Sequence, residues 1–334
     1  MKGRTVLALG GGGARGLAHV GVLEILEQGG VALDRIVGVS IGSVVGAAYA
    51  MEPDVAVIGE RIVKYVTSER FQEHQRTLNG ASRREKSSGT NSSNGTDSSN
   101  GNPSDADRQA MIGTPAERPK GLGFPWFNSI RDYLRANRLF KRVITQKSLL
   151  AGRLLVDVVE NILPDADIAD ARIPLSIVAV DLYTGHRTVL EKGPLRDAVR
   201  GSASLPGIFP PVELDGKLLA DIGIFAPLPT HEARYYRPDL LIAADVSPGI
   251  TETDAVDTAL GVILRMEEIA GTIFRDHVLS LADVVIHPEV GDLEWSDFSS
   301  VEHMIEQGRL AARGVLGDIV AYQESTRTSW SMIP

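Results

Sequence analysis

The first fifty residues contain two consecutive units in which an apolar strand is followed by a glycine-containing turn and a helix. In the first unit, residues 5–9 predict a buried strand, and residues 17–28 predict an amphipathic helix that ends at a glycine pair. In the second unit, residues 34–39 predict a strand and residues 43–50 a closely packed helix. This alternation predicts an α/β fold with a mainly parallel sheet, in which ligands meet the carboxyl ends of the strands.

Later segments continue this pattern along the 334-residue chain, which with 43% hydrophobic residues can bury one large core. Further strands are predicted over residues 175–180, 187–190, 240–245 and 284–286, and further helices over residues 195–204 and 256–279. We therefore expect a three-layer α/β/α arrangement. A single domain would span residues 1–334, with its core over about 5–290 and a helical C-terminal extension over about 291–334.

The overall composition excludes several classes of function. The formal net charge of −9 argues against nucleic acid as a partner, because phosphate contacts need a basic face. The absence of cysteine excludes disulfides, thiolate catalysis and cysteine-ligated zinc, and it fits a cytoplasmic protein. The N-terminal apolar run is too short for a signal peptide, and the longest apolar stretch, residues 36–51, is too short to span a bilayer. Any membrane contact is therefore expected to be peripheral.

Two central segments stand apart from the α/β pattern. Residues 87–105 contain no Val, Ile, Leu, Met or aromatic residue, so we expect about 76–120 to form a disordered Ser/Asn/Gly-rich insertion. Residues 128–153 are rich in Arg and Lys, with apolar residues interleaved. Such a basic amphipathic segment either lies on an anionic membrane surface or packs on the sheet as a solvated helix.

Ser40 lies between Gly38 and Gly42 at the predicted junction of the second strand and its helix. A nucleophile elbow requires this arrangement, because the sharp turn strains the serine backbone and larger side chains two positions away would collide. The alternative is an ordinary turn in which Ser40 caps the helix that follows. The five-residue pattern alone leaves both interpretations open.

The glycine loop of residues 10–16 permits several interpretations. Gly11, Gly13 and Gly16 satisfy the dinucleotide fingerprint, but the far end of the second strand holds Val39 and Ser40 instead of the acid that binds ribose. The loop instead predicts an oxyanion hole, because consecutive glycines expose backbone N–H groups ahead of a helix N-terminus. Glycines that merely permit close packing of helix and strand are a further alternative.

A serine nucleophile needs a base, and the sequence offers two kinds. Among the histidines after Ser40, His287 at a strand end is the best placed. Asp221 is the carboxylate candidate, because it emerges from the apolar run Leu218–Ala220 and is followed by Gly223. Three other acids also lie near strand ends, and spacing alone does not rank them: Asp181, Asp215 and Asp245.

Taken together, these motifs resemble the patatin-like phospholipases, and most closely their short single-domain bacterial branch. Residues 11–16 are similar to the oxyanion motif of that family, residues 38–42 to its nucleophile elbow, and residues 203–211 to the segment before its catalytic acid. Asp221-Ile222-Gly223 stands where the family has Asp-Gly-Gly or Asp-Gly-Ala. Ile222 therefore departs from the motif, with a side chain that would alter the local backbone or narrow the pocket.

The resemblance implies a lipid acyl hydrolase with a Ser–Asp dyad, in which Ser40 is the nucleophile and Asp221 the base. It also implies an oxyanion hole made by Gly11, Gly12 and Gly13, no metal or cofactor, and an acyl lipid as the substrate. The residues that support these motifs are Arg15, Gly16, Gly38, Gly42 and Gly223. The alternatives are a non-catalytic lipid-binding or regulatory protein and an NAD(P)-binding oxidoreductase.

Overall fold

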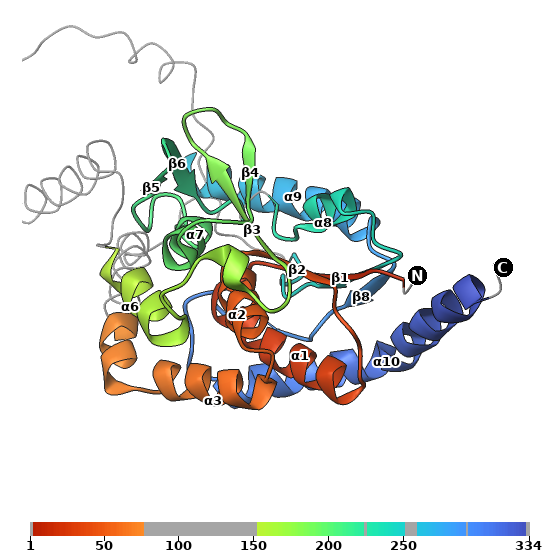
Figure 1. Cartoon of the computed structure of the whole chain (residues 1–334). Helices are drawn as coiled ribbons and strands as arrows, with labels where there is room; N and C mark the ends of the chain where they lie inside the picture. The colour runs from red at the N-terminus through yellow and green to blue at the C-terminus, as the bar shows by residue number, and fades with distance from the viewer. Residues whose placement is uncertain (1–2, 77–151, 224–225, 251–258, 292, 332–334) are drawn as a thin grey trace, which may run out of the picture. The chain divides into compact units, whose positions relative to one another are not determined.

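A single mixed sheet forms the centre of the computed structural model (Figure 1), which describes residues 3–76, 152–223, 226–250, 259–291 and 293–331. Its strands are β1 (Thr5–Leu9), β2 (Arg35–Val39), β3 (Leu175–Asp181), β4 (Arg187–Leu190), β5 (Val212–Leu214), β6 (Lys217–Ala220), β7 (Leu240–Ala244) and β8 (Val284–Ile286). They lie in the order β5-β6-β3-β2-β1-β7-β8, and β4 pairs with β3. The predicted strands are therefore present, and β5 is an addition that the sequence did not indicate.

The central strands run parallel. β1 pairs in parallel with β2 and β7, β2 with β3, and β7 with β8, whereas β4, β5 and β6 form antiparallel pairs. The expected α/β fold with a mainly parallel sheet is confirmed. Leu9 is in register with Gly38, so the glycine loop after β1 and the turn after β2 leave the same edge of the sheet side by side.

Helices cover both faces of the sheet. They are α1 (Ala18–Gln28), α2 (Ile41–Met51), α3 (Val55–Val66), α6 (Arg153–Ile162), α7 (Leu195–Ser202), α8 (Thr230–Tyr235), α9 (Ala259–Leu279) and α10 (Val301–Ser331), with 3₁₀ turns η1 (Gly13–Leu17) and η2 (Ile168–Asp170). Along β1, Leu7 and Leu9 point into the core beneath α1, α2 and α10, whereas Val6 and Ala8 point toward α8 and α9. This alternation builds the three layers (Figure 1).

The C-terminal helix α10 is part of the core. It packs along α1, and its residues Val301, Met304, Ile305, Ala312 and Ile319 belong to the main hydrophobic cluster. The expected end of the core at about residue 290 is therefore too early, because apolar side chains of α10 cover α1 as far as Ile319.

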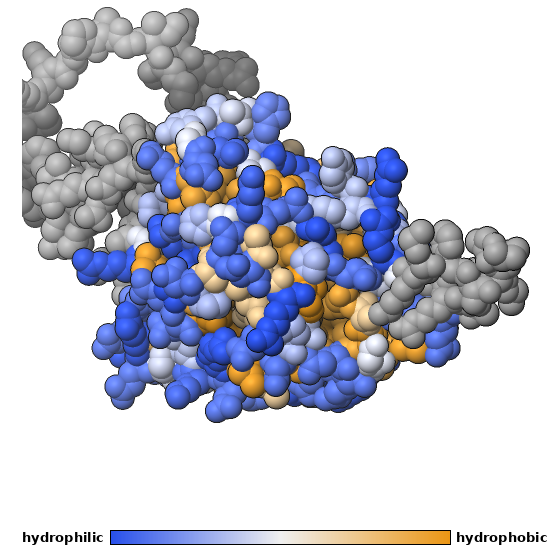
Figure 2. Space-filling view, in the orientation of Figure 1, coloured by the Kyte–Doolittle hydropathy of each residue, from blue (hydrophilic) through white to orange (hydrophobic). Residues whose placement is uncertain are grey.

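Parts of three predicted segments are not described by the structure. The predicted insertion and the basic segment 128–153 lie, apart from their terminal residues, outside the described residues, as does the start of the helix predicted from residue 256. In the described part, no helix combines the length and apolar character needed to cross a membrane. Figure 2 shows one face of the molecule, on which apolar patches are interspersed among hydrophilic side chains.

Candidate active site

Ser40 occupies a strained turn between β2 and α2. Its backbone angles are φ 53° and ψ −128°, a conformation that is rare for a residue with a side chain. Its side chain makes no capping hydrogen bond with α2, so the structure does not support the helix-cap interpretation. A side chain at Gly42 would overlap the carbonyl oxygens of Leu9 and Gly10. Glycine is therefore required where the start of α2 approaches the end of β1.

Two other serines hold this turn in place. The backbone N–H of Ser40 donates to Ser202 Oγ over 2.9 Å, and the Ser202 hydroxyl donates to the carbonyl oxygen of Val178 over 2.6 Å. The Ser43 hydroxyl donates to the carbonyl oxygen of Ser40 over 2.6 Å. Contacts from α7 and α2 thus fix both sides of the strained residue.

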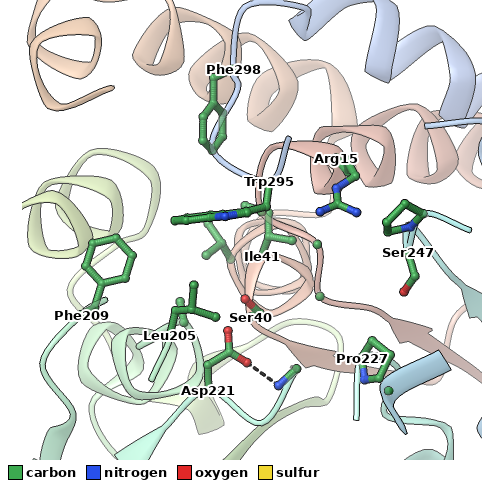
Figure 3. Close-up of a pocket in the computed structure, with 18 of the residues that line it drawn as sticks. Arg15, Ser40, Ile41, Leu205, Phe209, Asp221, Pro227, Ser247, Trp295 and Phe298 are labelled. Carbon is green, nitrogen blue, oxygen red and sulfur yellow. Dashed lines mark hydrogen bonds between the residues drawn. The ribbon is translucent and has the colours of Figure 1, made fainter. Parts of the chain in front are cut away.

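Asp221 follows β6 and lies opposite Ser40. Figure 3 shows the Ser40 hydroxyl and the Asp221 carboxylate pointing toward each other. Asp221 is only 2% exposed, and its Oδ1 accepts the backbone N–H of Gly223 over 2.6 Å. Burial raises the pKa of Asp221 to about 6, although hydrogen bonds with Ser40 and Gly223 oppose the increase. A carboxylate with this pKa is a stronger base than an ordinary aspartate.

The glycine loop presents two backbone N–H groups instead of three. The N–H of Gly11 donates to the carbonyl oxygen of Pro227 over 2.7 Å, so Gly11 does not fit the expected oxyanion donor. Within the described residues, no hydrogen-bond acceptor is found for the N–H groups of Gly12 and Gly13. Gly13 has a φ of 60°, and a side chain there would overlap the carbonyl oxygen of Trp295.

The other candidate base lies in a separate cluster. His287 Nδ1 is 2.9 Å from the backbone oxygen of Asp245 and 3.4 Å from its carboxylate, which also pairs with Arg275. Burial alone would raise the pKa of Asp245, but hydrogen bonds from His287 and Arg275 lower it to about 2. The hydrogen bond to Asp245 raises the pKa of His287. In the described residues, the hydrogen-bond partners of His287 are therefore Asp245 and Arg275, and Ser40 is not among them.

The remaining two acids near strand ends, Asp181 and Asp215, lie at turns between strands. Asp181 accepts hydrogen bonds from the Tyr183 N–H and the Thr184 hydroxyl, which fix the β3–β4 turn, and from the Leu218 N–H on β6. Asp215 lies in the β5–β6 turn with a φ of 49°. Neither contributes to the wall of the pocket around Ser40, so the geometry favours Asp221 among the carboxylates.

Ser40 and Asp221 share the wall of a pocket with a volume of about 540 Å³ (Figure 3). One side of the pocket is apolar, with side chains from α2, α6, the helical residues 69–76, the loop after α7 and the 295–298 loop. Its apolar lining includes Ile41, Val44, Phe71, Leu154, Leu155, Val158, Leu205, Phe209, Trp295 and Phe298. Arg15 and Ser247 lie on the other side of Ser40. The pocket has the size and lining expected for an apolar ligand with one polar end.

Two residues from the sequence motifs occupy different environments. Arg15 is partly buried in the pocket wall, burial lowers its pKa, and within the described chain its Nε has no hydrogen-bond partner. Ile222 is 8% exposed and packs with Val39 and Val178 on the face of the sheet covered by α8 and α9. The expectation that Ile222 narrows the pocket is therefore not met, because its side chain does not line the pocket.

Several residues at this site were absent from the sequence-based set. Ser202 and Ser43 hold Ser40, while Pro227 and Trp295 accept N–H groups of the glycine loop. The sequence offered no signal for these four residues. It did offer one for a fifth residue, His19, because a histidine stands out among the apolar residues of α1. Among the described residues, no group of three or more His, Asp or Glu side chains could hold a metal ion.

Comparison with known proteins gives one family match. A family model for patatin-like phospholipase matches residues 7–234, more than half of the chain. The uncharacterized NTE family protein Rv1063c of Mycobacterium tuberculosis is 28% identical over 246 residues, which cover 73% of this chain and 49% of that protein. Patatin-like phospholipase domain-containing protein 6 of Mus musculus is 28% identical over 249 residues, or 74% and 14% of the two chains. The chain thus spans about half the length of the mycobacterial relative.

Among solved structures, VipD from Legionella pneumophila is similar with a TM-score of 0.44 and 13% sequence identity. The match covers 95% of this chain and 67% of VipD.

Proposed function

The chain belongs to the patatin-like phospholipase family, and we propose that it is a serine hydrolase that cleaves the carboxylic ester bonds of acyl lipids. One observation carries this proposal. The hydroxyl of Ser40, on a strained turn, faces the buried carboxylate of Asp221 in the wall of a largely apolar pocket (Figure 3). A serine beside a base, with an apolar site for the substrate, is the arrangement that acyl transfer requires.

In the proposed reaction, Ser40 Oγ attacks the acyl carbon of the ester while Asp221 accepts the hydroxyl proton. The tetrahedral intermediate then collapses, Asp221 returns the proton to the leaving alcohol, and the acyl group remains on Ser40. Water deprotonated by Asp221 then attacks the acyl carbon of this acyl-enzyme, the bond to Ser40 Oγ breaks, and Asp221 returns the proton to Oγ as the fatty acid leaves. The raised pKa of Asp221 supports its role, because a base is most effective when its pKa is near the working pH.

The negative oxygen of the intermediate would be stabilised by the N–H groups of Gly12 and Gly13. Both groups lack an acceptor in the described part of the chain, and they lie at the start of η1, which leads into α1. The N-terminus of a helical segment adds positive potential at this position. Loss of one such donor typically slows acyl transfer by about 100- to 1000-fold.

The apolar side of the pocket is the proposed binding site for the acyl chain. Phe71, Leu154, Val158 and Phe209 would surround it, and the ester would lie at Ser40. An acyl lipid is therefore the proposed substrate. We further propose peripheral contact with a membrane, since the substrate would be drawn from a lipid surface.

Hydrolysis of a chromogenic acyl ester tests the dyad. We expect Ser40→Ala and Asp221→Asn each to abolish hydrolysis, and His287→Ala, as the matched control, to retain it. Fluorophosphonate should label the wild type at Ser40, and mass spectrometry of the modified peptide would locate the adduct. A folded wild type that never reacts would instead support a non-catalytic lipid-binding role, and loss of activity in the histidine variant alone would overturn the dyad.

A further inference from the structure

His19 lies in the buried face of α1, directly beneath the glycine loop. Its side chain is fully buried, and its Nε2 is 2.8 Å from the carbonyl oxygen of Gly10. Burial lowers the pKa of His19 to about 4, so the ring is neutral near pH 7. Because a carbonyl oxygen only accepts hydrogen bonds, Nε2 carries the ring proton and donates it to Gly10.

The other ring nitrogen of His19 has no partner. Nδ1 is one of three buried side-chain nitrogen or oxygen atoms in the described residues that have no hydrogen-bond partner. An unsatisfied buried acceptor lowers stability, and an apolar side chain of similar size would avoid this cost. The neighbours of His19 in sequence, Leu17, Val22 and Leu23, are buried members of the apolar core, and the charge of Asp245 raises the pKa of His19 less than the hydrogen bond to Gly10 does. Within the described residues, the hydrogen bond to Gly10 is therefore the one hydrogen bond that the His19 side chain makes.

That hydrogen bond acts on a peptide group that is held from both sides. The carbonyl oxygen of Gly10 and the N–H of Gly11 belong to the same trans peptide, so they point in opposite directions. His19 donates to the oxygen, while the N–H donates to Pro227 over 2.7 Å. Rotation of this peptide plane would break both bonds. The first peptide of the glycine loop is thus fixed in orientation.

The far end of the loop is fixed as well. The N–H of Ala14 donates to the carbonyl oxygen of Trp295 over 2.7 Å. Gly12 and Gly13 lie between these two anchors, and Gly12 is backed by Val246, whose Cγ2 would lie 2.9 Å from a side chain at Gly12. Their N–H directions therefore depend on the orientation of the Gly10–Gly11 peptide.

We infer that His19 is a positioning residue for the reaction proposed above. By donating to Gly10 it holds the glycine loop so that the N–H groups of Gly12 and Gly13 are already aimed at the oxyanion before substrate binds. It is not among the residues that line the pocket, so it acts through the loop and not on the substrate. Preorganised donors stabilise a transition state without reorganisation, and small displacements of such groups slow catalysis substantially.

Three substitutions separate the hydrogen bond from the volume of the ring. His19→Phe removes the donor and keeps an aromatic ring, His19→Gln places an N–H at the reach of Nε2, and His19→Asn carries a donor that is too short. We expect kcat to fall about 10- to 100-fold in the Phe and Asn variants, with KM changed by less than about twofold. The Gln variant should recover most of the wild-type kcat. Val22→Ala, on the same helix and fully buried, is the control for lost stability, and its kcat should stay near that of the wild type.

Hydrogen exchange of the peptide covering residues 8–17 provides a measurement independent of activity. Exchange of the Gly11 N–H should be about tenfold or more faster in the Phe variant and close to wild type in the Gln variant, whereas α2 should be unchanged. Unchanged exchange in a folded Phe variant would overturn the inference. A variant whose loop exchanges faster but which keeps the full wild-type kcat would also overturn it.

If the Phe variant does not fold, kcat and hydrogen exchange of the Gln and Asn variants decide the question instead. A wild type that hydrolyses no ester would refute the proposed function, and exchange alone would then decide whether His19 holds the loop.

Discussion

The hydroxyl oxygen of Ser202 lies 2.9 Å from the backbone nitrogen of Ser40 and accepts its N–H. The same hydroxyl donates to Val178 on β3, so Ser202 connects the turn after β2 to the neighbouring strand. The backbone conformation of Ser40 costs about 1–3 kcal/mol and persists only if the surrounding structure enforces it. Ser202 is thus one of the groups that enforce the strained turn.

Replacing Ser202 by alanine should therefore destabilise the fold and slow the proposed reaction. The change leaves the Ser40 N–H and the Val178 carbonyl without this partner, at an expected cost of about 1–3 kcal/mol in the free energy of unfolding. Urea denaturation and kcat measure the two effects. Ser204→Ala is the matched control, because the Ser204 hydroxyl donates only to Arg200 in the preceding turn of the chain. Equal losses of kcat in both variants would show that the contact to Ser40 has no special role.

The sequence predicted the elements that local patterns specify. Apolar runs located β1 and β8 with their observed bounds, and the glycines around Ser40 predicted its strained turn. Long-range partners were not predictable. Ser202 lies 162 residues from Ser40 in the chain, and nothing in the pattern of its helix marks it as a hydrogen-bond acceptor.

The glycine loop illustrates the same limit. A run of glycines predicts exposed N–H groups, but it does not indicate which of them other parts of the chain will engage. The carbonyl of Pro227, from the loop before α8, takes the N–H of Gly11 and leaves those of Gly12 and Gly13. The glycine motif therefore predicted where N–H groups are exposed, but not which of its glycines would offer a free N–H to the proposed oxyanion.

The rate of the proposed reaction should depend on pH through Asp221. Its pKa of about 6 means that the carboxylate is ionised, and able to accept a proton, only above that pH. We expect kcat/KM to rise tenfold per pH unit below about pH 6 and to level off above it. A profile that levels off near pH 4 would show that the base is an ordinary, solvated carboxylate.

The same raised pKa predicts a trade between stability and activity. A carboxyl group with a folded-state pKa above its ordinary 3.8 stabilises the fold when protonated, and this contribution is lost as the pH rises through about 6. Asp221→Asn removes the buried charge, so at pH 8 it should be more stable than the wild type by up to about 3 kcal/mol while being inactive. Below about pH 4 the two proteins should unfold at similar denaturant concentrations. A variant that is less stable at pH 8 would contradict this prediction.

Ile222 should matter for stability and not for the reaction. Its side chain packs with Val39 and Val178 away from the pocket, so Ile222→Ala should lower the free energy of unfolding by about 2–5 kcal/mol. Ile222→Val, which retains most of the volume, should cost about 0.5–1.5 kcal/mol. At a temperature where both variants are folded, kcat should stay within a few-fold of the wild type. An increase in kcat with either variant would mean that Ile222 restricts the site.

Gly42 should tolerate no side chain, because the start of α2 lies directly against the end of β1. A methyl group there would overlap the carbonyl oxygens of Leu9 and Gly10, which are backbone atoms and cannot rotate away. Gly42→Ala must therefore separate α2 from β1 and move Ser40 relative to the glycine loop, so we expect a lower melting temperature and at least a tenfold loss of kcat.

Gly317→Ala on α10 is the contrasting control, because that position is exposed and a side chain there meets nothing within 4 Å. It should raise stability by about 0.5–1 kcal/mol through better helix propensity and leave kcat unchanged. If Gly42→Ala kept the wild-type melting temperature and kcat, the close approach of the two elements would not be what positions Ser40.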